Sequence, residues 1–171
     1  WIGGRIPITD LLSEALRRQL NHSNSGDKPV DREMKLLDPV LQTQQRLSMI
    51  PSENELLIEQ VISREGRHLF VFPFEGRFVH EGLAALWSMR FVQREPSTFS
   101  VSVNDYGFEL LAPVDYPFEE GLDEVMAADP EELEAQVADA VNLSELTQRR
   151  FRGVAQVAGL VFQGYPGSRK T

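Results

Sequence analysis

Two pairs of short segments with alternating side chains, each pair joined by a tight turn, most constrain the fold of this chain. The segments are 56–63 and 67–74, then 98–103 and 108–111. Their turns are Glu65-Gly66 and Asn104–Gly107. A period of two is typical of half-buried strands, and two strands joined by a short turn pair as an antiparallel hairpin. The sequence therefore predicts two β-hairpins.

Helical patterns surround these hairpins. We expect helices over 9–20, capped by Thr9, and over 79–94, with Trp87 on the apolar side. A polar loop is expected over 21–30. Between Asp31 and Pro51 a helical pattern is interrupted at Asp38-Pro39, where aspartate can cap a restarted helix and proline can take its first position. In the last third, Asp129-Pro130 and Asn142 are start signals, and the second helix is expected to run to about Val161.

The predicted fold class is α+β, an antiparallel sheet built from hairpins and packed with several helices, because hairpins replace the crossovers of parallel sheets. Pro73 cannot donate to a strand ladder and should lie at an edge or a strand end. An open sheet and a sheet curled into a small barrel both fit this pattern. The 171 residues are expected to form one domain, residues 1–171.

Composition limits the function. The absence of cysteine excludes disulfides and thiolate metal ligands and favours the cytoplasm. No apolar run approaches the ~20 residues of a membrane span. The net charge of −9 opposes independent binding of nucleic acid, because cations supply most of that affinity. Residues 119–139 carry acids without Lys or Arg, whereas 149–171 carry bases without acids. Two solvated helix faces would explain this asymmetry as well as a binding surface does.

Signatures of cofactor chemistry are missing. There is no G-x-x-x-x-G-K-[ST] loop for ATP and no G-x-G-x-x-G after a strand, so no cofactor is expected in this fragment. His80-Glu81 supplies half of a zinc helix, but position 84, where the second histidine must fall, is alanine. We predict no metal site and expect His80 to be either a hydrogen-bonded or a surface histidine.

A nucleophile–base pair is conceivable but unsupported. The candidate side chains are Ser100, Ser102, His68, His80 and Asp105. No serine lies in a G-x-S-x-G elbow, so no catalytic residue is predicted.

The turn Asn104–Gly107 has two interpretations. As a turn, Asn104 and Asp105 would cap their own backbone and Gly107 would take positive φ. Tyr106 could also stack on a nucleic-acid base, which tolerates any sequence. The turn alone is the simpler interpretation.

Five segments in order resemble a known family. They are 1–7 (Trp-Ile-Gly-Gly-Arg-Ile-Pro), 63–77, 79–86, 98–111 and 157–167. Together they resemble the carboxy-terminal region of ligase-associated DEXH-box DNA helicases, which belong with the Lhr (large helicase-related) proteins. The likeness spans nearly the whole chain and is weakest in 8–50 and 112–140.

The resemblance implies a longer parent with two RecA-like motor domains, a winged helix and then this region. Such parents are ATP-driven helicases that move 3′-to-5′ along single-stranded DNA, with a role in DNA repair. ATP and magnesium would bind upstream, so no catalytic residue of the family transfers to this chain. The start at Trp1 rather than methionine fits a fragment of a longer helicase chain.

Three hypotheses follow. The chain is an accessory domain that braces the motor and winged-helix domains and contacts single-stranded DNA, or a protein–protein scaffold without DNA contact, or, least favoured, a small hydrolase using His80, Glu81 or Asp105. Contact with DNA would use a set of basic side chains and one aromatic platform. These are Arg64, Arg67, Arg77, Arg149, Arg150 and Arg152 with Tyr106.

Overall fold

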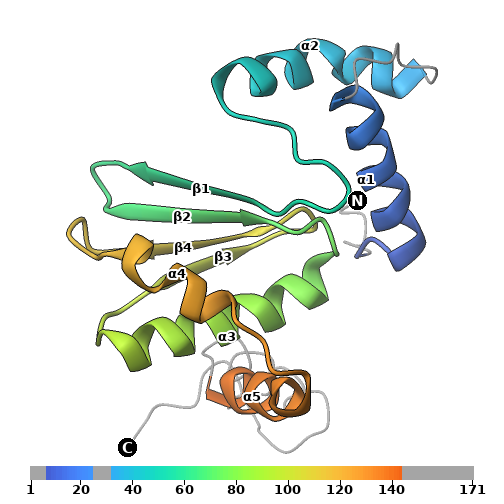
Figure 1. Cartoon of the computed structure of the whole chain (residues 1–171). Helices are drawn as coiled ribbons and strands as arrows, with labels where there is room; N and C mark the ends of the chain where they lie inside the picture. The colour runs from blue at the N-terminus through green and yellow to red at the C-terminus, as the bar shows by residue number, and fades with distance from the viewer. Residues whose placement is uncertain (1–6, 25–31, 144–171) are drawn as a thin grey trace, which may run out of the picture. The chain divides into compact units, whose positions relative to one another are not determined.

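The computed structural model describes residues 7–24 and 32–143 (Figure 1). The chain divides into two compact units, Trp1–Ala127 and Ala128–Thr171. The first unit holds α1 (Asp10–Asn24), α2 (Arg32–Leu47), β1 (Leu57–Ile62), β2 (Arg67–Phe72), α3 (Arg77–Arg94), β3 (Ser100–Val103), β4 (Phe108–Ala112) and α4 (Phe118–Met126). The second unit holds α5 (Pro130–Leu143). Asp129 caps α5 as predicted, since its Oδ1 accepts the Glu131 N–H at 3.0 Å.

Both predicted hairpins are present and join into one antiparallel sheet. The strand order is β1-β2-β4-β3, so the inner strands of the two hairpins pair with each other. The α+β fold class is thereby confirmed. Within the described residues the sheet stays open, with β1 and β3 at its edges, so the barrel alternative is not adopted. Pro73 follows the end of β2, the position expected for a residue that lacks an N–H.

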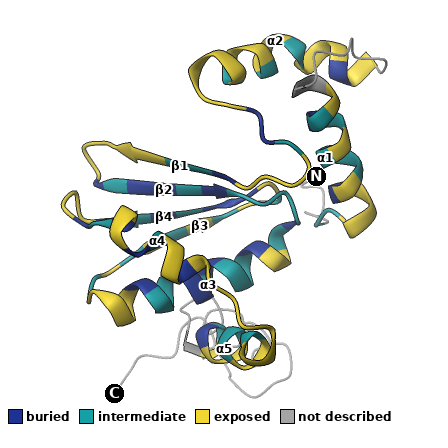
Figure 2. Cartoon of the chain, in the orientation of Figure 1, coloured by how far each residue is buried: buried dark blue, intermediate teal, exposed yellow. Residues whose placement is uncertain are grey.

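One face of the sheet forms the core of the first unit. Leu69, Val71 and Leu110 are fully buried on this face, which α3 crosses (Figures 1 and 2). Trp87 of α3 packs edge-on against Phe108, with ring centroids 5.5 Å apart, so its predicted place on the apolar side is confirmed. The alternation of the strands therefore determines which face α3 covers.

An aromatic cluster fastens α4 to α3. Phe91 of α3 lies 5.0 Å from the Phe118 ring and 6.0 Å from the Tyr116 ring, and Phe99 completes the group. The Tyr116 hydroxyl donates to the carbonyl of Phe91 at 2.9 Å, which satisfies the polar atom of a buried ring. Helix α4 was not among the predicted helices, although Phe118, Gly121 and Val125 form its buried face.

Two helix boundaries differ from the expectation. The interruption at Asp38-Pro39 was wrong, because α2 runs unbroken from Arg32 to Leu47 with Pro39 inside. Pro39 and Lys35 are exposed, so the carbonyl that loses its helical N–H partner can bond to water instead. α1 also continues to Asn24, into the predicted loop. The helix predicted from Asn142 to Val161 lies almost entirely outside the described residues.

Candidate functional site

Two loops meet at the end of the sheet from which α3 starts, and we call residues 73–77 and 104–107 together the loop end. The Phe74 N–H donates to the Tyr106 carbonyl at 3.2 Å and joins the two loops directly. Phe74 has φ of 56° and Gly76 has φ of 86°, and such a conformation is strained for a bulky residue like phenylalanine. The loop end is therefore a tight structure held by its surroundings.

His80 is buried and links the two loops of the loop end through hydrogen bonds. Its Nε2 accepts the Glu75 N–H at 3.0 Å, and its Nδ1 lies 2.8 Å from the Asn104 carbonyl, to which it donates. Burial lowers the pKa of His80, and the Asn104 carbonyl and two nearby carboxylates, Glu75 and Asp105, oppose that shift. Of the two roles that the sequence leaves open for His80, a hydrogen-bonded or a surface histidine, the structure shows the first. With both nitrogens engaged, His80 is not free to act as a base, which weakens the hydrolase hypothesis.

Tyr106 lies at the exposed tip of the second loop. Asn104 Oδ1 accepts the N–H groups of Tyr106 at 2.8 Å and Gly107 at 3.0 Å, so the predicted turn is confirmed. Positive φ at Gly107 was a wrong expectation. Glycine is needed there because a Cβ would lie 2.2 Å from the Val71 carbonyl oxygen. The Tyr106 side chain is 53% exposed and is available to a partner.

Polar atoms at the loop end remain without partners inside the described part of the chain. Arg77 Nε and Asp105 Oδ1 are buried and have no hydrogen bond there. Arg17 of α1 pairs with Glu75 at 2.6 Å, yet its Nε is similarly unpaired. Buried polar groups are normally satisfied, so these atoms are candidates for contact with another molecule or chain segment.

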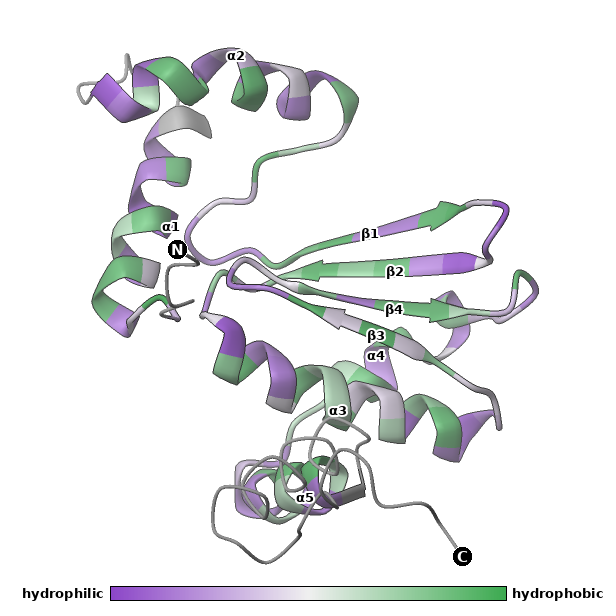
Figure 3. Cartoon of the chain, turned by 180° about the vertical axis from the view of Figure 1, so that it is seen from behind, coloured by the Kyte–Doolittle hydropathy of each residue, from purple (hydrophilic) through white to green (hydrophobic). Residues whose placement is uncertain are grey.

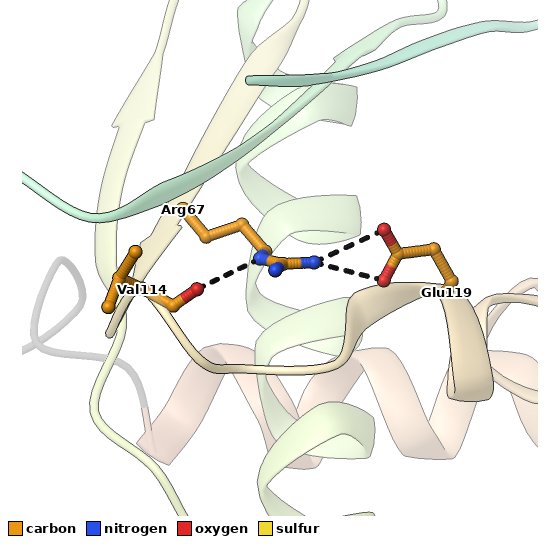
Figure 4. A network of polar contacts seen from close by, with 3 residues as sticks. All are labelled: Arg67, Val114 and Glu119. Atoms are coloured by element: carbon orange, nitrogen blue, oxygen red, sulfur yellow. Dashed lines mark hydrogen bonds and ion pairs between the residues drawn. The ribbon is translucent and has the colours of Figure 1, made fainter. Parts of the chain in front are cut away.

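Arg64 and Arg67 lie at the opposite end of the sheet, in and after the β1–β2 turn. Arg67 donates from Nε to the Val114 carbonyl at 3.1 Å and from Nη1 to both carboxylate oxygens of Glu119 at 3.2 Å (Figure 4). A phosphate would have to compete with Glu119 for this guanidinium. Arg64 is exposed in the turn.

The structure thus separates the predicted DNA-contacting side chains. Arg77 and Tyr106 share the loop end, whereas Arg64 and Arg67 lie about 20 Å away, one length of β2. The predicted residues Arg149, Arg150 and Arg152 lie outside the described residues.

A series of hydrogen bonds that was not predicted from the sequence connects Ser63, His68 and Glu109. The Ser63 hydroxyl lies 2.6 Å from His68 Nε2, and Glu109 Oε1 lies 2.6 Å from Nδ1. Ser63 Oγ also accepts the Glu65 N–H at 3.0 Å, which is the bond of a serine that closes its own turn. These hydrogen bonds therefore link the β1–β2 hairpin to β4. Only the strand register brings Glu109 close to His68, so spacing along the sequence gave no signal.

The described residues also bear on the other candidate catalytic residues and on a metal site. Ser100 and Ser102 lie on β3, whereas the ring nitrogens of His80 are bonded to the two loops. Across residues 7–24 and 32–143, no group of three or more His, Asp or Glu side chains could hold a metal ion. In the same ranges, no helix is long and apolar enough to cross a membrane.

Several large apolar residues of α1 and α2 are exposed. Figure 3 shows hydrophobic stretches along the ribbons of both helices. On α2, Leu36 is 74% and Leu47 is 76% exposed, and on α1, Leu11 is 77% exposed. We call this set the leucine face, which comprises Leu11, Leu12, Leu36, Leu37, Val40 and Leu47. On α2, Leu36, Val40 and Leu47 recur at helical spacing on one side of the helix. Exposed apolar residues that recur on one side of a helix are candidates for contact with another molecule or domain.

Comparison with known families identifies the class of domain. The sequence model of the family described as DEAD/H associated matches residues 50–171, most of the chain. The chain belongs to this DEAD/H associated family. The match starts after α2, so it covers the sheet and the helices that follow.

Individual relatives narrow the class to domains of Lhr-type helicases, which confirms the resemblance seen in the sequence. The chain is 26% identical over 175 residues to an "ATP-dependent helicase Lhr-Core" of Methanocaldococcus jannaschii, covering 96% of this chain and 20% of the relative. It is 27% identical over 128 residues to an "ATP-dependent helicase Lhr-Core protein 2" of Thermococcus barophilus, covering 75% of this chain and 15% of the relative. The chain therefore spans a fifth or less of these relatives.

A solved structure shares the fold. It is the Mycobacterium smegmatis helicase Lhr bound to ssDNA and AMP-PNP, with a TM-score of 0.71 and 22% sequence identity. The likeness covers 100% of this chain and 23% of that one. The fold seen here thus occurs as about a quarter of a larger helicase chain.

Proposed function

We propose that this domain braces the motor and winged-helix domains of an ATP-dependent 3′-to-5′ DNA helicase of the Lhr type, which works in DNA repair in the cytoplasm. The relatives that it matches are named ATP-dependent helicases and are much longer than this chain. ATP and magnesium would act in the motor. This chain would then have a mechanical rather than a catalytic role. Both ring nitrogens of His80 are already hydrogen-bonded, which agrees with that role.

The observation that carries the proposal is the leucine face. Exposing several leucines to water costs free energy that burial against a partner would recover, at about 25 cal/mol per Å² of apolar surface. The helices that bear this face precede the family match, which starts at residue 50. They are therefore well placed in the sequence to join the accessory domain to the neighbouring parts of a helicase.

The brace is tested by the double change Leu36→Ser with Leu47→Ser in the longer helicase. We expect ATP hydrolysis stimulated by DNA to persist while strand separation per ATP falls about tenfold, the effect of losing about 1.4 kcal/mol at a docking surface. Because both side chains are exposed, thermal melting of the isolated chain should not change. Lys35→Ser, exposed on the same helix, is the matched control. Unwinding that matches the control would contradict the brace.

Contact with single-stranded DNA at the loop end is the finer part of the proposal. Tyr106 offers an exposed ring for stacking on a base, and Arg77 offers a cation at the start of α3, where helix N–H groups also favour phosphate. The solved helicase with this fold is bound to ssDNA. Arg64, Arg67, Arg149, Arg150 and Arg152 remain candidates for further contacts to the backbone of the strand.

Tyr106→Ala should weaken binding of single-stranded DNA about fivefold, because base–aromatic stacking is worth about 1 kcal/mol or more. Tyr106→Phe retains the ring and should bind like the unchanged chain. Fluorescence anisotropy at several salt concentrations measures both variants, and affinity should fall as salt rises. If the chain has no affinity even at low salt, direct contact by this domain alone is excluded. The scaffold hypothesis, a domain that touches only protein, would then be favoured.

A further inference from the structure

The face of the sheet opposite to the core carries a row of aromatic rings along β2. Side chains alternate between the two faces of a strand, so His68, Phe70 and Phe72 share the face away from α3, the described helix that packs most extensively on the sheet (Figure 1). The ring centroids are 5.7 Å apart from His68 to Phe70, 6.4 Å from Phe70 to Phe72 and 6.3 Å from Phe72 to Phe74. The three phenylalanines are half-buried. We call these four residues the aromatic row.

Two carboxylates flank the centre of the aromatic row. Glu59 of β1 and Glu109 of β4 both lie opposite Phe70 in the ladder, so the three side chains are neighbours on one face. Glu59 accepts a long hydrogen bond of 3.4 Å from Gln44 of α2, and Glu109 lies 2.6 Å from His68 Nδ1. Within the described residues, neither carboxylate pairs with a lysine or an arginine, and no strand residue on this face is basic. The face is therefore aromatic and acidic.

We propose that the aromatic row binds an arginine side chain from a neighbouring domain of the longer helicase chain, with the guanidinium against Phe70 and between Glu59 and Glu109. A guanidinium fits both features, because it stacks on aromatic rings and forms hydrogen bonds with carboxylates. The same carboxylates repel phosphate, so single-stranded DNA is disfavoured on this face. This chain covers 20% of one helicase relative and 15% of another, so neighbouring domains of the same molecule are the nearest source of such an arginine. The inference rests on the proposed role as a brace.

A short peptide tests whether the face binds an arginine. Acetyl-Gly-Arg-Gly-amide, titrated into the 171-residue chain and followed by NMR, should shift the ring signals of Phe70 and Phe72. The ring signals of Phe91, which is fully buried in the core, should not move. The same peptide with citrulline, which has the shape of arginine without its charge, should bind about tenfold more weakly, because it loses both the cation–π attraction and the ion pairs.

Substitutions on the face separate the carboxylates from the ring. Glu59→Gln should weaken binding of the arginine peptide about threefold, since one ion pair is lost. Phe70→Leu retains an apolar side chain but no aromatic ring, and it should weaken binding by a similar factor. Glu65→Gln removes the same charge from the exposed β1–β2 turn, outside the ladder positions of this face, and is the matched control that should bind like the unchanged chain. Circular dichroism checks that each variant is folded.

The longer helicase tests whether the arginine belongs to the same molecule. Saturation-transfer NMR should detect peptide binding to the 171-residue chain but not to the longer helicase, whose own arginine already occupies the face. No binding to either protein, equal binding to both, affinity indifferent to Glu59→Gln, or ring shifts caused by oligothymidine instead of the peptide would overturn the proposal. Failure of the brace at the leucine face would be seen separately, in unwinding by the double variant of Leu36 and Leu47, because the peptide binds to the sheet.

Discussion

Replacing Phe91 by alanine should lower the free energy of unfolding by about 3–5 kcal/mol, the range for removing a buried aromatic ring. Phe91 is fully buried and contacts the rings of Phe99, Tyr116 and Phe118. Its loss leaves a cavity that joins α3, α4 and the start of β3. Urea unfolding followed by circular dichroism measures the effect.

Two variants calibrate this prediction. Phe91→Leu retains part of the volume and should cost clearly less than alanine. Val92→Ala changes the neighbouring residue, which is 40% exposed, and should cost about 1 kcal/mol or less. If Phe91→Ala were no more destabilising than Val92→Ala, the aromatic cluster would not be the centre of this core.

Replacing His80 by alanine should cost about 2–4 kcal/mol at neutral pH, because the change removes two hydrogen bonds and leaves the Glu75 N–H and the Asn104 carbonyl without their partner. Since these bonds join the two loops, we also expect faster hydrogen exchange at Tyr106 and Gly107 than in the unchanged chain. Exchange that stays unchanged at both residues would show that His80 does not hold the loop end.

Acid should destabilise the chain through the same side chain. The pKa of folded His80 lies below the ordinary 6.5, so the unfolded state takes up the proton first as pH falls. The stability from neutral His80 is present above about pH 6.5 and is lost below it, by at most about 1.4 kcal/mol per pH unit, until the folded pKa is reached. His80→Gln removes this titration. Urea midpoints at about pH 7.5 and about pH 5.5, on either side of the ordinary pKa, should therefore separate more for the unchanged chain than for the variant.

Local sequence patterns were sufficient to predict both hairpins and most of the helix starts. Alternation and turn residues act between neighbours, so Thr9, Asp129 and Asn104 could be assigned their capping roles without tertiary information. The prediction was wrong at Pro39 because a local breaking signal was overridden: the helix continues on an exposed surface where the lost bond is tolerated. Helix α4 was missed because it is only nine residues long and starts after Pro117 without a side-chain cap.

The candidate site was predicted in pieces. The sequence predicted the turn that carries Tyr106, and it left His80 as either a hydrogen-bonded or a surface histidine. The hydrogen bond between His80 and Asn104 joins residues 24 positions apart, and the bond between His68 and Glu109 spans 41 positions. Sequence periodicity cannot reveal contacts between residues so far apart along the chain, because the pairing of the strands decides which of them meet.

The sequence by itself determined an α+β chain of two hairpins and flanking helices, and its motif order identified the helicase family. Only the tertiary structure decided that the inner strands of the hairpins pair, which leaves β1 at an open edge. It also decided that Arg77 and Tyr106 share one end of the sheet while Arg67 is bound to Glu119 at the other. The physical reason is that period and capping act over a few residues, whereas pairing and docking depend on side chains that meet only when the chain folds.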